Sequence, residues 1–304
     1  MASEEERVSS MRKKIFIAAG LALFGLTAVW QFALVPRLTE RIPAGWQWEA
    51  NYIGYQTYLD PKTGKLPEKD VPTTYSQAID IVANSRQPGS VELDDRYSIH
   101  DIASGKVTWE YNYVAAVDPR TGAHLKPEYR GDYFLFPRNV ERKTYNLRFS
   151  YLKGIPVAFQ SEEEVVGLAA YLFTYHGRGE YTESYLGTAE YPGVKVMPEQ
   201  EIKCADDQFV FKAWVEPVTG EILKIEENCL ATDYIYEIAT GKQIEGVDRW
   251  SGETAGNDVV NRVETVSRDR TRLVWQARYI PTGLFVAGLL CFGLVLLPKK
   301  AIRK

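Results

Sequence analysis

The chain has 304 residues, of which 45% are hydrophobic, and its formal net charge is −4. This length allows one large domain or two small ones, and the slightly negative mean hydropathy excludes a transporter built largely of membrane helices. Both chain ends are net positive, so the part between them is strongly acidic, which argues against nucleic acid as a partner.

The first predicted element is a transmembrane helix over the uncharged apolar run from Ile15 to Val35, behind a tail of residues 1–14. A helix rises about 1.5 Å per residue, so this run spans about 30 Å, the hydrocarbon thickness of a bilayer. A cleaved signal peptide is the alternative, but its apolar region would be only about 7–15 residues long. The end of the run, QFALVPRL, offers no good cleavage site, so we expect an uncleaved anchor.

The region from 36 to 279 is rich in tyrosine, valine and threonine, which favour β-strands. One pattern recurs in it: an acidic residue, two variable positions, a threonine or serine, and a glycine. The acidic side chain accepts hydrogen bonds from backbone N–H groups, and the glycine adopts the left-handed conformation that closes a hairpin. The predicted turns begin and end at Asp60 and Gly64, Asp101 and Gly105, Asp118 and Gly122, Glu216 and Gly220, and Glu237 and Gly241.

These turns predict a mainly β domain of antiparallel hairpins, with a few helices, held outside the cytoplasm between two membrane helices. Strand-like segments flank the turns, for example at Val107–Val117 and Phe209–Val215. The irregular spacing of the turns argues against a solenoid or a propeller. A calcium-binding interpretation is weaker, because the loops lack the dense run of oxygen ligands that calcium requires.

Three stretches of this region have helical features. Thr73–Asn84 begins with a capping threonine and repeats apolar residues at helical spacing, and Ser161–Glu164 is a short acidic segment. The third, residues 256–279, predicts a membrane-proximal helix that leads directly into a second apolar run. Four of its valines are predicted to share one face, and two aromatic residues to lie at the membrane interface: Val259, Val260, Val263, Val266, Trp275 and Tyr279.

Two of the three cysteines, Cys204 and Cys229, lie in the predicted outer domain. In an oxidising compartment they would form a structural disulfide that closes a loop of about 25 residues and contributes about 3 kcal/mol. Two unpaired buried thiols are the alternative. Cys291 lies in the second apolar run, where a thiol behaves as a small apolar group.

The second predicted transmembrane helix is the uncharged run Ile280–Pro298, followed by a basic tail of residues 299–304. Basic residues flank both spans at the chain ends, and positively charged flanks stay in the cytoplasm. We therefore expect a double-pass plasma-membrane protein with both termini cytoplasmic and the region 36–279 outside. Arg37, Arg41 and Arg278 reduce the contrast in charge between the two sides.

Sequence motifs of catalysis and metal binding are missing. The three histidines, His100, His124 and His176, have no metal-ligand spacing. We expect His124 to be exposed after a turn and His176 to lie in a loop. The sequence therefore predicts no catalytic residue, no cofactor and no metal site.

Paired acidic residues occur at Asp94–Asp95, Asp206–Asp207 and Glu162–Glu164. Such pairs can perform acid–base chemistry where burial separates their pKa values. Neighbours on a strand point to opposite faces, however, so the simpler expectation is solvated surface side chains.

Several motifs occur in an order that resembles a bacterial family, best known from actinobacteria, the PorA-family porins. The resemblance covers nearly the whole chain and implies an amino-terminal anchor, a β-rich outer domain and a carboxy-terminal anchor. The family offers no active site to carry over. The motifs are Val117-Asp-Pro-Arg-Thr-Gly122, Phe136-Pro-Arg-Asn-Val-Glu-Arg-Lys-Thr-Tyr145, Glu162-Glu-Glu-Val-Val-Gly-Leu168, Tyr171-Leu-Phe173 and Trp214-Val-Glu-Pro-Val-Thr-Gly220.

The predicted helical spans differ from an outer-membrane porin barrel, which needs many tilted strands with an outward apolar band. A pore would instead require the helices of several copies of the chain. Gln31 is the one strongly polar residue in the two runs, so a wet lumen has little polar lining.

The function favoured by these observations is a non-enzymatic binding or scaffold domain of the cell envelope. Its partners would be the lipid bilayer and an envelope protein, a glycan or a lipid ligand, because a tyrosine-rich surface suits adaptable recognition. Two alternatives stay open: an oligomeric pore or lipid-binding transport protein, and an envelope enzyme with a dispersed carboxylate site.

Overall fold

The structure is a computed structural model that describes residues 4–43, 45–58, 71–82, 89–125, 133–148, 153–180, 197–203, 205–228 and 233–296. The chain forms two compact units. The helical unit consists of Met1–Pro43 and Arg268–Lys304, and the β unit consists of Ala44–Ser267. The predicted outer domain, 36–279, extends past the β unit at both ends.

The helical unit contains two long apolar helices. α1 (Glu4–Val29) continues through a π-helical turn, η1 (Trp30–Leu34), into α2 (Val35–Leu38). A second π-helical turn, η3 (Trp275–Tyr279), leads into α4 (Ile280–Leu296). Both helical stretches, Ser10–Leu38 and Gly256–Leu296, contain a segment long and apolar enough to cross a membrane.

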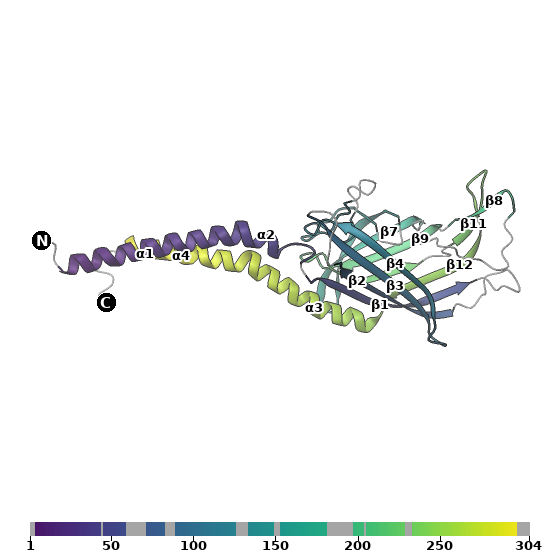
Figure 1. The fold of residues 1–304 in the computed structure, drawn as a ribbon, viewed down its shortest axis with the longest axis horizontal. Helices are drawn as coiled ribbons and strands as arrows, with labels where there is room; N and C mark the ends of the chain where they lie inside the picture. Colours follow the sequence, from purple (N-terminus) through teal and green to yellow (C-terminus); the bar gives the residue numbers. More distant parts are fainter. Residues whose placement is uncertain are drawn as a thin grey trace. The chain divides into compact units, whose positions relative to one another are not determined.

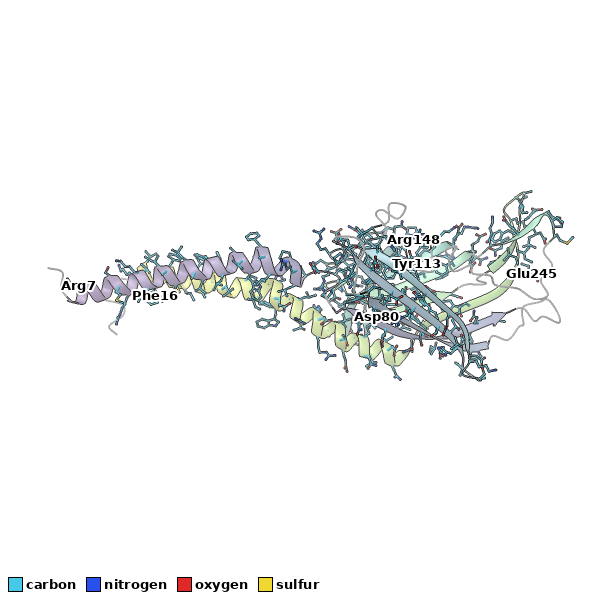
Figure 2. All side chains as sticks on the ribbon, in the orientation of Figure 1. Arg7, Phe16, Asp80, Tyr113, Arg148 and Glu245 are labelled. Atoms are coloured by element: carbon cyan, nitrogen blue, oxygen red, sulfur yellow. The ribbon has the colours of Figure 1, made fainter. Side chains whose placement is uncertain are left out.

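Helices α1 and α4 pack against each other in antiparallel directions, with phenyl rings placed over glycines. A Cβ at Gly20 would lie 2.6 Å from the Phe292 ring, and one at Gly288 would lie 2.9 Å from the Phe24 ring. The rings of Phe24 and Phe292 stack with their centroids 5.6 Å apart. Glycine therefore lets the two helices approach closely. Carbon-rich side chains project along both helices (Figure 2).

The two π-helical turns are joined by a side-chain hydrogen bond. Trp30 Nε1 donates to the backbone oxygen of Gln276 over 2.8 Å. A π-helical turn disturbs the regular helical ladder, so a carbonyl in it gains from an external donor. Next to this bond, the rings of Trp275 and Tyr279 lie 5.1 Å apart.

The β unit is built on one sheet, whose strands are drawn as arrows in Figure 1. Every pair of neighbouring strands in this sheet is antiparallel. The predicted fold class is therefore confirmed: mainly antiparallel β, with candidate membrane helices at both chain ends. The strand order is β4-β3-β2-β1-β12-β10-β9-β7-β6-β5, and β11 pairs with β12 and β8. The strands are β1 (Gln47–Tyr58), β2 (Val71–Ile81), β3 (Val91–Asp101), β4 (Val107–Val117), β5 (Tyr145–Leu147), β6 (Ile155–Val165), β7 (Leu168–Glu180), β8 (Gln200–Lys203), β9 (Ala205–Val215), β10 (Ile222–Asn228), β11 (Asp233–Glu237) and β12 (Gln243–Thr254).

Alternating burial places one face of the sheet in the core. On β3, Leu93, Asp95, Tyr97 and Ile99 are buried, and the residues between them are not. This period of two is that of a pleated strand with one face covered.

The prediction of a helix over Thr73–Asn84 is wrong within the residues that the structure describes, because these form strand β2. Thr73, Gln77 and Ile79 are buried, a spacing that fits one face of a strand. Strand β2 pairs with β1 on one side and β3 on the other over nearly its whole length. These ladder hydrogen bonds outweigh the local helical pattern, because propensity is a weak determinant in a central strand.

The acidic segment Ser161–Glu164 is likewise a strand and not a helix. It belongs to β6, where Glu162 faces Tyr171 and Glu164 faces Ala169 of β7. The register shifts between Phe159 and Ser161, so a bulge lies just before the segment.

Helix α3 (Gly256–Val274) lays an apolar face on the sheet. Val259, Val263 and Val266 are buried in one cluster with Leu168 and other residues of β6, β7 and β10. Val260 was predicted to share this face, but it is 42% exposed. The reason is geometric: about 100° of helical rotation separates neighbouring residues, which turns Val260 away from Val259.

Polar contacts tie the start of α3 to β1. The backbone N–H and the side-chain amide of Asn51 both donate to Asp258 Oδ2, over 2.5 and 2.9 Å. The guanidinium of Arg262 lies 4.3 Å from the centre of the Trp48 ring and donates to the backbone oxygen of Glu49. Burial lowers the Arg262 pKa. The first turns of α3 are therefore part of the β unit.

The substitution Val263→Ala should lower the free energy of unfolding by about 1–3 kcal/mol, because it removes buried methyl groups from the contact between α3 and the sheet. Val260→Ala is the matched control on the same helix, and its effect should stay within about 0.5 kcal/mol. Chemical denaturation followed by tryptophan fluorescence measures both. Equal effects of the two substitutions would contradict this packing.

Candidate functional site

A hollow on the β unit, here called the β1–β12 groove, crosses the strands from β2 to β9. Its volume of about 700 Å³ lies within the range of small-molecule sites. The lining residues are Ile53, Gly54, Tyr55, Pro72, Thr73, Ile102, Val210, Lys212, Glu226, Glu227, Asn228, Ser251, Gly252 and Glu253.

Two glycines shape the floor of this groove. Gly54 of β1 is directly opposite Gly252 of β12 in the register of the two strands. A Cβ at Gly54 would lie 2.0 Å from the backbone oxygen of Ser251, a distance that no side chain tolerates. The backbones thus approach closely where both residues lack side chains, and the sheet is hollowed there.

The groove combines exposed apolar side chains with an adjacent row of charged side chains. This charged row consists of Lys212, Glu226 and Lys224. Ile53, Tyr55 and Ile102 are 47%, 49% and 54% exposed, which is high for large apolar residues. Beside them, Glu226 pairs with Lys212 at 3.0 Å and with Lys224 at 2.7 Å. This arrangement can accept a ligand that has both an apolar part and a polar or charged part.

The same pairs decide the charge states beside the groove. Burial alone would raise the Glu226 pKa, but hydrogen bonds from Lys224 and Lys212 lower it below its usual value. Burial alone would lower the Lys224 pKa, but hydrogen bonds to Glu226 and Glu253 raise it. Both changes favour the charged forms, so the row carries opposite charges at neutral pH.

A second, polar hollow lies over strands β1 to β4. Its volume is about 570 Å³. Ser76 Oγ donates to Asn51 Oδ1 at 2.8 Å, and Asn51, Ser76, Ser98 and Glu110 are opposite one another across the four strands. This row presents hydroxyl, amide and carboxylate groups without the exposed apolar side chains of the β1–β12 groove.

A polar network is buried between β1, β2 and β3. Tyr52 donates from its hydroxyl to Gln77 Oε1 at 3.1 Å, and Gln77 Nε2 donates to Asp95 Oδ1 at 2.9 Å and to the Tyr97 hydroxyl. Burial raises the Tyr52 pKa well above its usual value, and the charges of Glu227 and Asp95 act in the same direction. Tyr52 therefore stays protonated and serves as a donor in this network.

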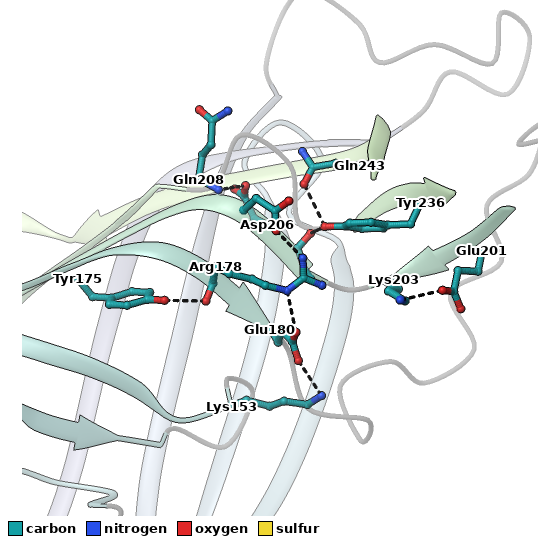
Figure 3. A network of polar contacts seen from close by, with 12 residues as sticks. Lys153, Tyr175, Arg178, Glu180, Glu201, Lys203, Asp206, Gln208, Tyr236 and Gln243 are labelled. Atoms are coloured by element: carbon teal, nitrogen blue, oxygen red, sulfur yellow. Dashed lines mark hydrogen bonds and ion pairs between the residues drawn. The ribbon is translucent and has the colours of Figure 1, made fainter. Parts of the chain in front are cut away.

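A further cluster of charges surrounds Arg178 near the end of β7 (Figure 3). Arg178 pairs with Glu180 at 2.7 Å and with Asp207, and its guanidinium lies 5.3 Å from the centre of the Tyr236 ring. Lys153 pairs with Glu180 at 3.1 Å. Burial would lower the Arg178 pKa, but the bonds to Glu180 and Asp207 raise it. The charges in this cluster are mutually compensated, which is typical of a structural network.

Four of the five predicted turns lie within the described residues. In each, the glycine N–H donates to the backbone oxygen of the acidic residue over 2.8 or 2.9 Å. The glycines have φ values between 65° and 73°. The pairs are Asp101 and Gly105, Asp118 and Gly122, Glu216 and Gly220, and Glu237 and Gly241. Asp60 and Gly64 lie outside the described residues.

The acidic side chains in these turns accept backbone N–H groups. Asp101 Oδ1 accepts from Ser104 at 2.6 Å, and Asp118 Oδ1 accepts from Arg120 at 2.8 Å. The side-chain hydrogen bond with Ser104 is the main cause of a lowered Asp101 pKa. These contacts are those of hairpin turns.

The turn that ends at Gly220 differs, because it is buried. Glu216 is 1% exposed, and a Cβ at Gly220 would lie 2.3 Å from the backbone oxygen of Pro137. The N–H groups of Asn139 and Val140 donate to the backbone oxygens of Val218 and Pro217, over 3.0 and 2.7 Å. Two motifs of the family resemblance, at 136–145 and 214–220, therefore meet in the core.

Several expectations about polar residues are wrong. His124 is 4% exposed, and its ring lies 5.6 Å from that of Phe134, because the chain after the turn folds back over the core. His176 lies in strand β7 and not in a loop. Asp95 and Asp206 are fully buried, since alternation along a strand turns one member of each acidic pair inward.

One further prediction concerns the two cysteines of the predicted outer domain. Cys204 and Cys229 fall outside the described residues, so their disulfide stays a prediction. In the described part of the chain, no group of histidine, cysteine, aspartate and glutamate is placed to hold a metal ion.

The β1–β12 groove was not anticipated from the sequence. The sequence does contain one weak signal, because Gly54 and Gly252 each lie inside a strand pattern. A glycine in such a position marks a bulge or a close approach of another backbone. Only the pairing of the first strand with the last one, separated by about 200 residues, brings these glycines together.

Two antiparallel apolar helices from the chain ends, together with a β unit, define the class of this protein: a β-rich membrane protein. Within this class, the chain belongs to the porin PorA family, because the family model described as Porin PorA matches residues 14–297. The match includes α4 and the whole β unit, so the resemblance seen in the sequence motifs is confirmed.

No curated protein matches the chain. Among solved structures, the crystal structure of an N-terminal dehydratase from the difficidin assembly line is 8% identical and aligns over 71% of this chain and 82% of that chain. Its TM-score of 0.11 is too low to indicate a shared fold.

The charge cluster at Arg178 predicts a pH-dependent contribution to stability. Hydrogen bonds from Arg178 and Lys153 lower the Glu180 pKa, so its contribution is present above the unfolded-state pKa and is lost as the pH falls through the folded-state pKa. Glu180→Gln should therefore lower stability at pH 7 by up to about 1 kcal/mol, the range of solvent-screened ion pairs, and by less in acid.

Thermal unfolding measured from pH 7 down to pH 3 tests this expectation. Glu164→Gln, which removes an exposed carboxylate from strand β6, is the matched control. If the difference in stability between Glu180→Gln and the parent stays constant with pH, the charge of the Glu180 carboxylate contributes nothing to stability.

Proposed function

We propose that this protein anchors a β domain at the outer side of the plasma membrane, and that this domain binds an amphipathic, lipid-like ligand in the β1–β12 groove. The domain holds the ligand and catalyses no reaction on it. The observation that carries this proposal is the groove of about 700 Å³ with its exposed apolar residues and adjacent charged row.

The lining chemistry favours an amphipathic ligand over a fully polar one. Ile53, Tyr55 and Ile102 would bury apolar surface against an alkyl chain, at about 25 cal/mol per Å². Lys212 and Glu226, which are 42% and 31% exposed, are positioned to contact a polar head group. A glycan or a protein would fit the polar hollow over β1 to β4 better than this groove.

The orientation rests on the charges of the two tails. The amino-terminal tail carries Arg12, Lys13 and Lys14, and the carboxy-terminal tail carries Lys299 and Lys300 among its basic residues. The antiparallel packing of α1 and α4 brings the first residues of α1 and the last residues of α4, which these tails adjoin in the sequence, to the same end of the helix pair. Positively charged flanks stay in the cytoplasm, which supports an outer position for the β unit.

The ligand proposal is tested by photo-crosslinking of the full-length protein with a diazirine-bearing fatty acid, followed by mass-spectrometric mapping. Adducts are expected on peptides from β1, β9 and β12. Ile53→Asp should reduce them by about tenfold, because a carboxylate in the apolar part opposes the alkyl chain.

Val114→Asp is the matched control for this experiment. Val114 is 48% exposed, close to the 47% of Ile53, and lies on β4 outside the groove. It should leave the adducts unchanged. An adduct yield that Ile53→Asp leaves unchanged, or adducts that map only to α1 and α4, would refute a ligand site in the groove.

A pore formed by the membrane helices of several copies is a second candidate, which the family description Porin PorA supports. In this case Gln31, which is exposed on η1, would supply polar lining. Discrete conductance steps in planar bilayers are then expected, and Gln31→Leu should reduce the unit conductance severalfold. A parent protein that gives no steps at any protein concentration would exclude this candidate.

A further inference from the structure

The helical unit carries a concentration of arginine beside its apolar helices. Six arginines lie in residues 37–41 and 268–278, against two carboxylates, Glu40 and Asp269. Arg41 is buried, whereas the other five are exposed. These five, called the arginine collar below, are Arg37, Arg268, Arg270, Arg272 and Arg278.

The depth of the collar in a bilayer follows from the length of the helices. A rise of about 1.5 Å per residue places the end of a 30 Å hydrocarbon layer, counted back from Leu296, near Gln276. Gln276 accepts the hydrogen bond of Trp30, and Trp275 and Tyr279 are more than half exposed beside it. Aromatic side chains of this kind gather where hydrocarbon meets head groups.

The collar then lies within the layer of lipid head groups or just outside it. Arg272 is about 6 Å and Arg268 about 12 Å outward from Gln276 along the helix, and Arg37 is about 10 Å outward from Trp30. A head-group layer is about 5–8 Å thick on each side of the hydrocarbon. Arg272 therefore starts inside this layer, whereas Arg37 and Arg268 start just outside it and reach it by extending their long side chains toward the membrane. Arg278 starts slightly deeper, and its long side chain reaches this layer by extending outward.

The choice of arginine points to a specific chemistry. Every basic residue of the collar is arginine, whose planar guanidinium donates paired hydrogen bonds to phosphate oxygens. These arginines also oppose the proposed orientation, in which the β unit lies outside, because basic residues beside a membrane span favour the cytoplasmic side.

We propose that the arginine collar binds the phosphate groups of anionic phospholipids in the membrane leaflet from which the β unit emerges. The partner is a head group within the bilayer and not a soluble anion. This binding is independent of any ligand in the β1–β12 groove, since none of the collar residues lines that groove.

The test uses the full-length protein in detergent with equal amounts of phosphatidylglycerol and phosphatidylcholine, and native mass spectrometry counts the retained lipids. The parent should retain phosphatidylglycerol preferentially. The triple variant Arg37→Gln, Arg272→Gln, Arg278→Gln should lose this preference by about tenfold, because each basic group near the surface attracts anionic lipid.

The matched control removes the same number of positive charges from exposed positions of the β unit, by Lys106→Gln, Arg120→Gln and Lys242→Gln. It should retain the preference of the parent. If the collar variant does not fold, Arg272→Gln is compared with Lys106→Gln in the same way. Inorganic phosphate added to the parent should displace no phosphatidylglycerol.

Three outcomes would overturn the proposal. They are a parent without preference for phosphatidylglycerol, a collar variant that keeps the preference, and displacement of the lipid by inorganic phosphate, which would indicate a site for soluble anions. Because the groove ligand is tested separately with Ile53→Asp, failure of one proposal leaves the other intact.

Discussion

The pairing of the first strand with the last one is the constraint on which the rest of this structure depends. Tyr52 of β1 is opposite Thr254 of β12, so the chain enters and leaves the β unit at neighbouring points. The segments that precede β1 and follow β12 therefore start close together, and within the helical unit α1 and α4 pack as a pair. The same pairing brings Gly54 opposite Gly252 and creates the groove, so architecture and candidate site have one origin.

The sequence predicted those features that depend on local chemistry. The apolar runs, the acidic turns closed by glycine and the amphipathic α3 are encoded within about 20 residues each, where length, periodicity and turn residues are informative. The β2 segment was misread, because Thr73, Gln77 and Ile79 satisfy a helical and a strand pattern almost equally well. Its two partner strands, and not its own residues, decide between the patterns.

The candidate site depended on distant residues and was therefore not predicted. Gly54 and Gly252 carry a weak signal separately, and the apolar side chains of Ile53 and Ile102 look like ordinary strand residues. Burial of Asp95 was also unexpected, because its hydrogen bond comes from Gln77 on the neighbouring strand. Polar groups of this kind enter a core only when a partner is supplied by the tertiary structure.

The turn at Gly220 is buried, whereas the turns at Gly105 and Gly241 are open, and this difference matters for protein engineering. An ideal Cβ at Gly105 or Gly241 meets no atom within 4 Å, whereas the turn at Gly220 is enclosed by the backbone of Phe136 and Pro137. Loop tips surrounded by open space tolerate insertions, while enclosed ones do not. A fluorophore or affinity epitope inserted after Ser104 or Thr240 would thus report on the β unit in living cells without disturbing its core.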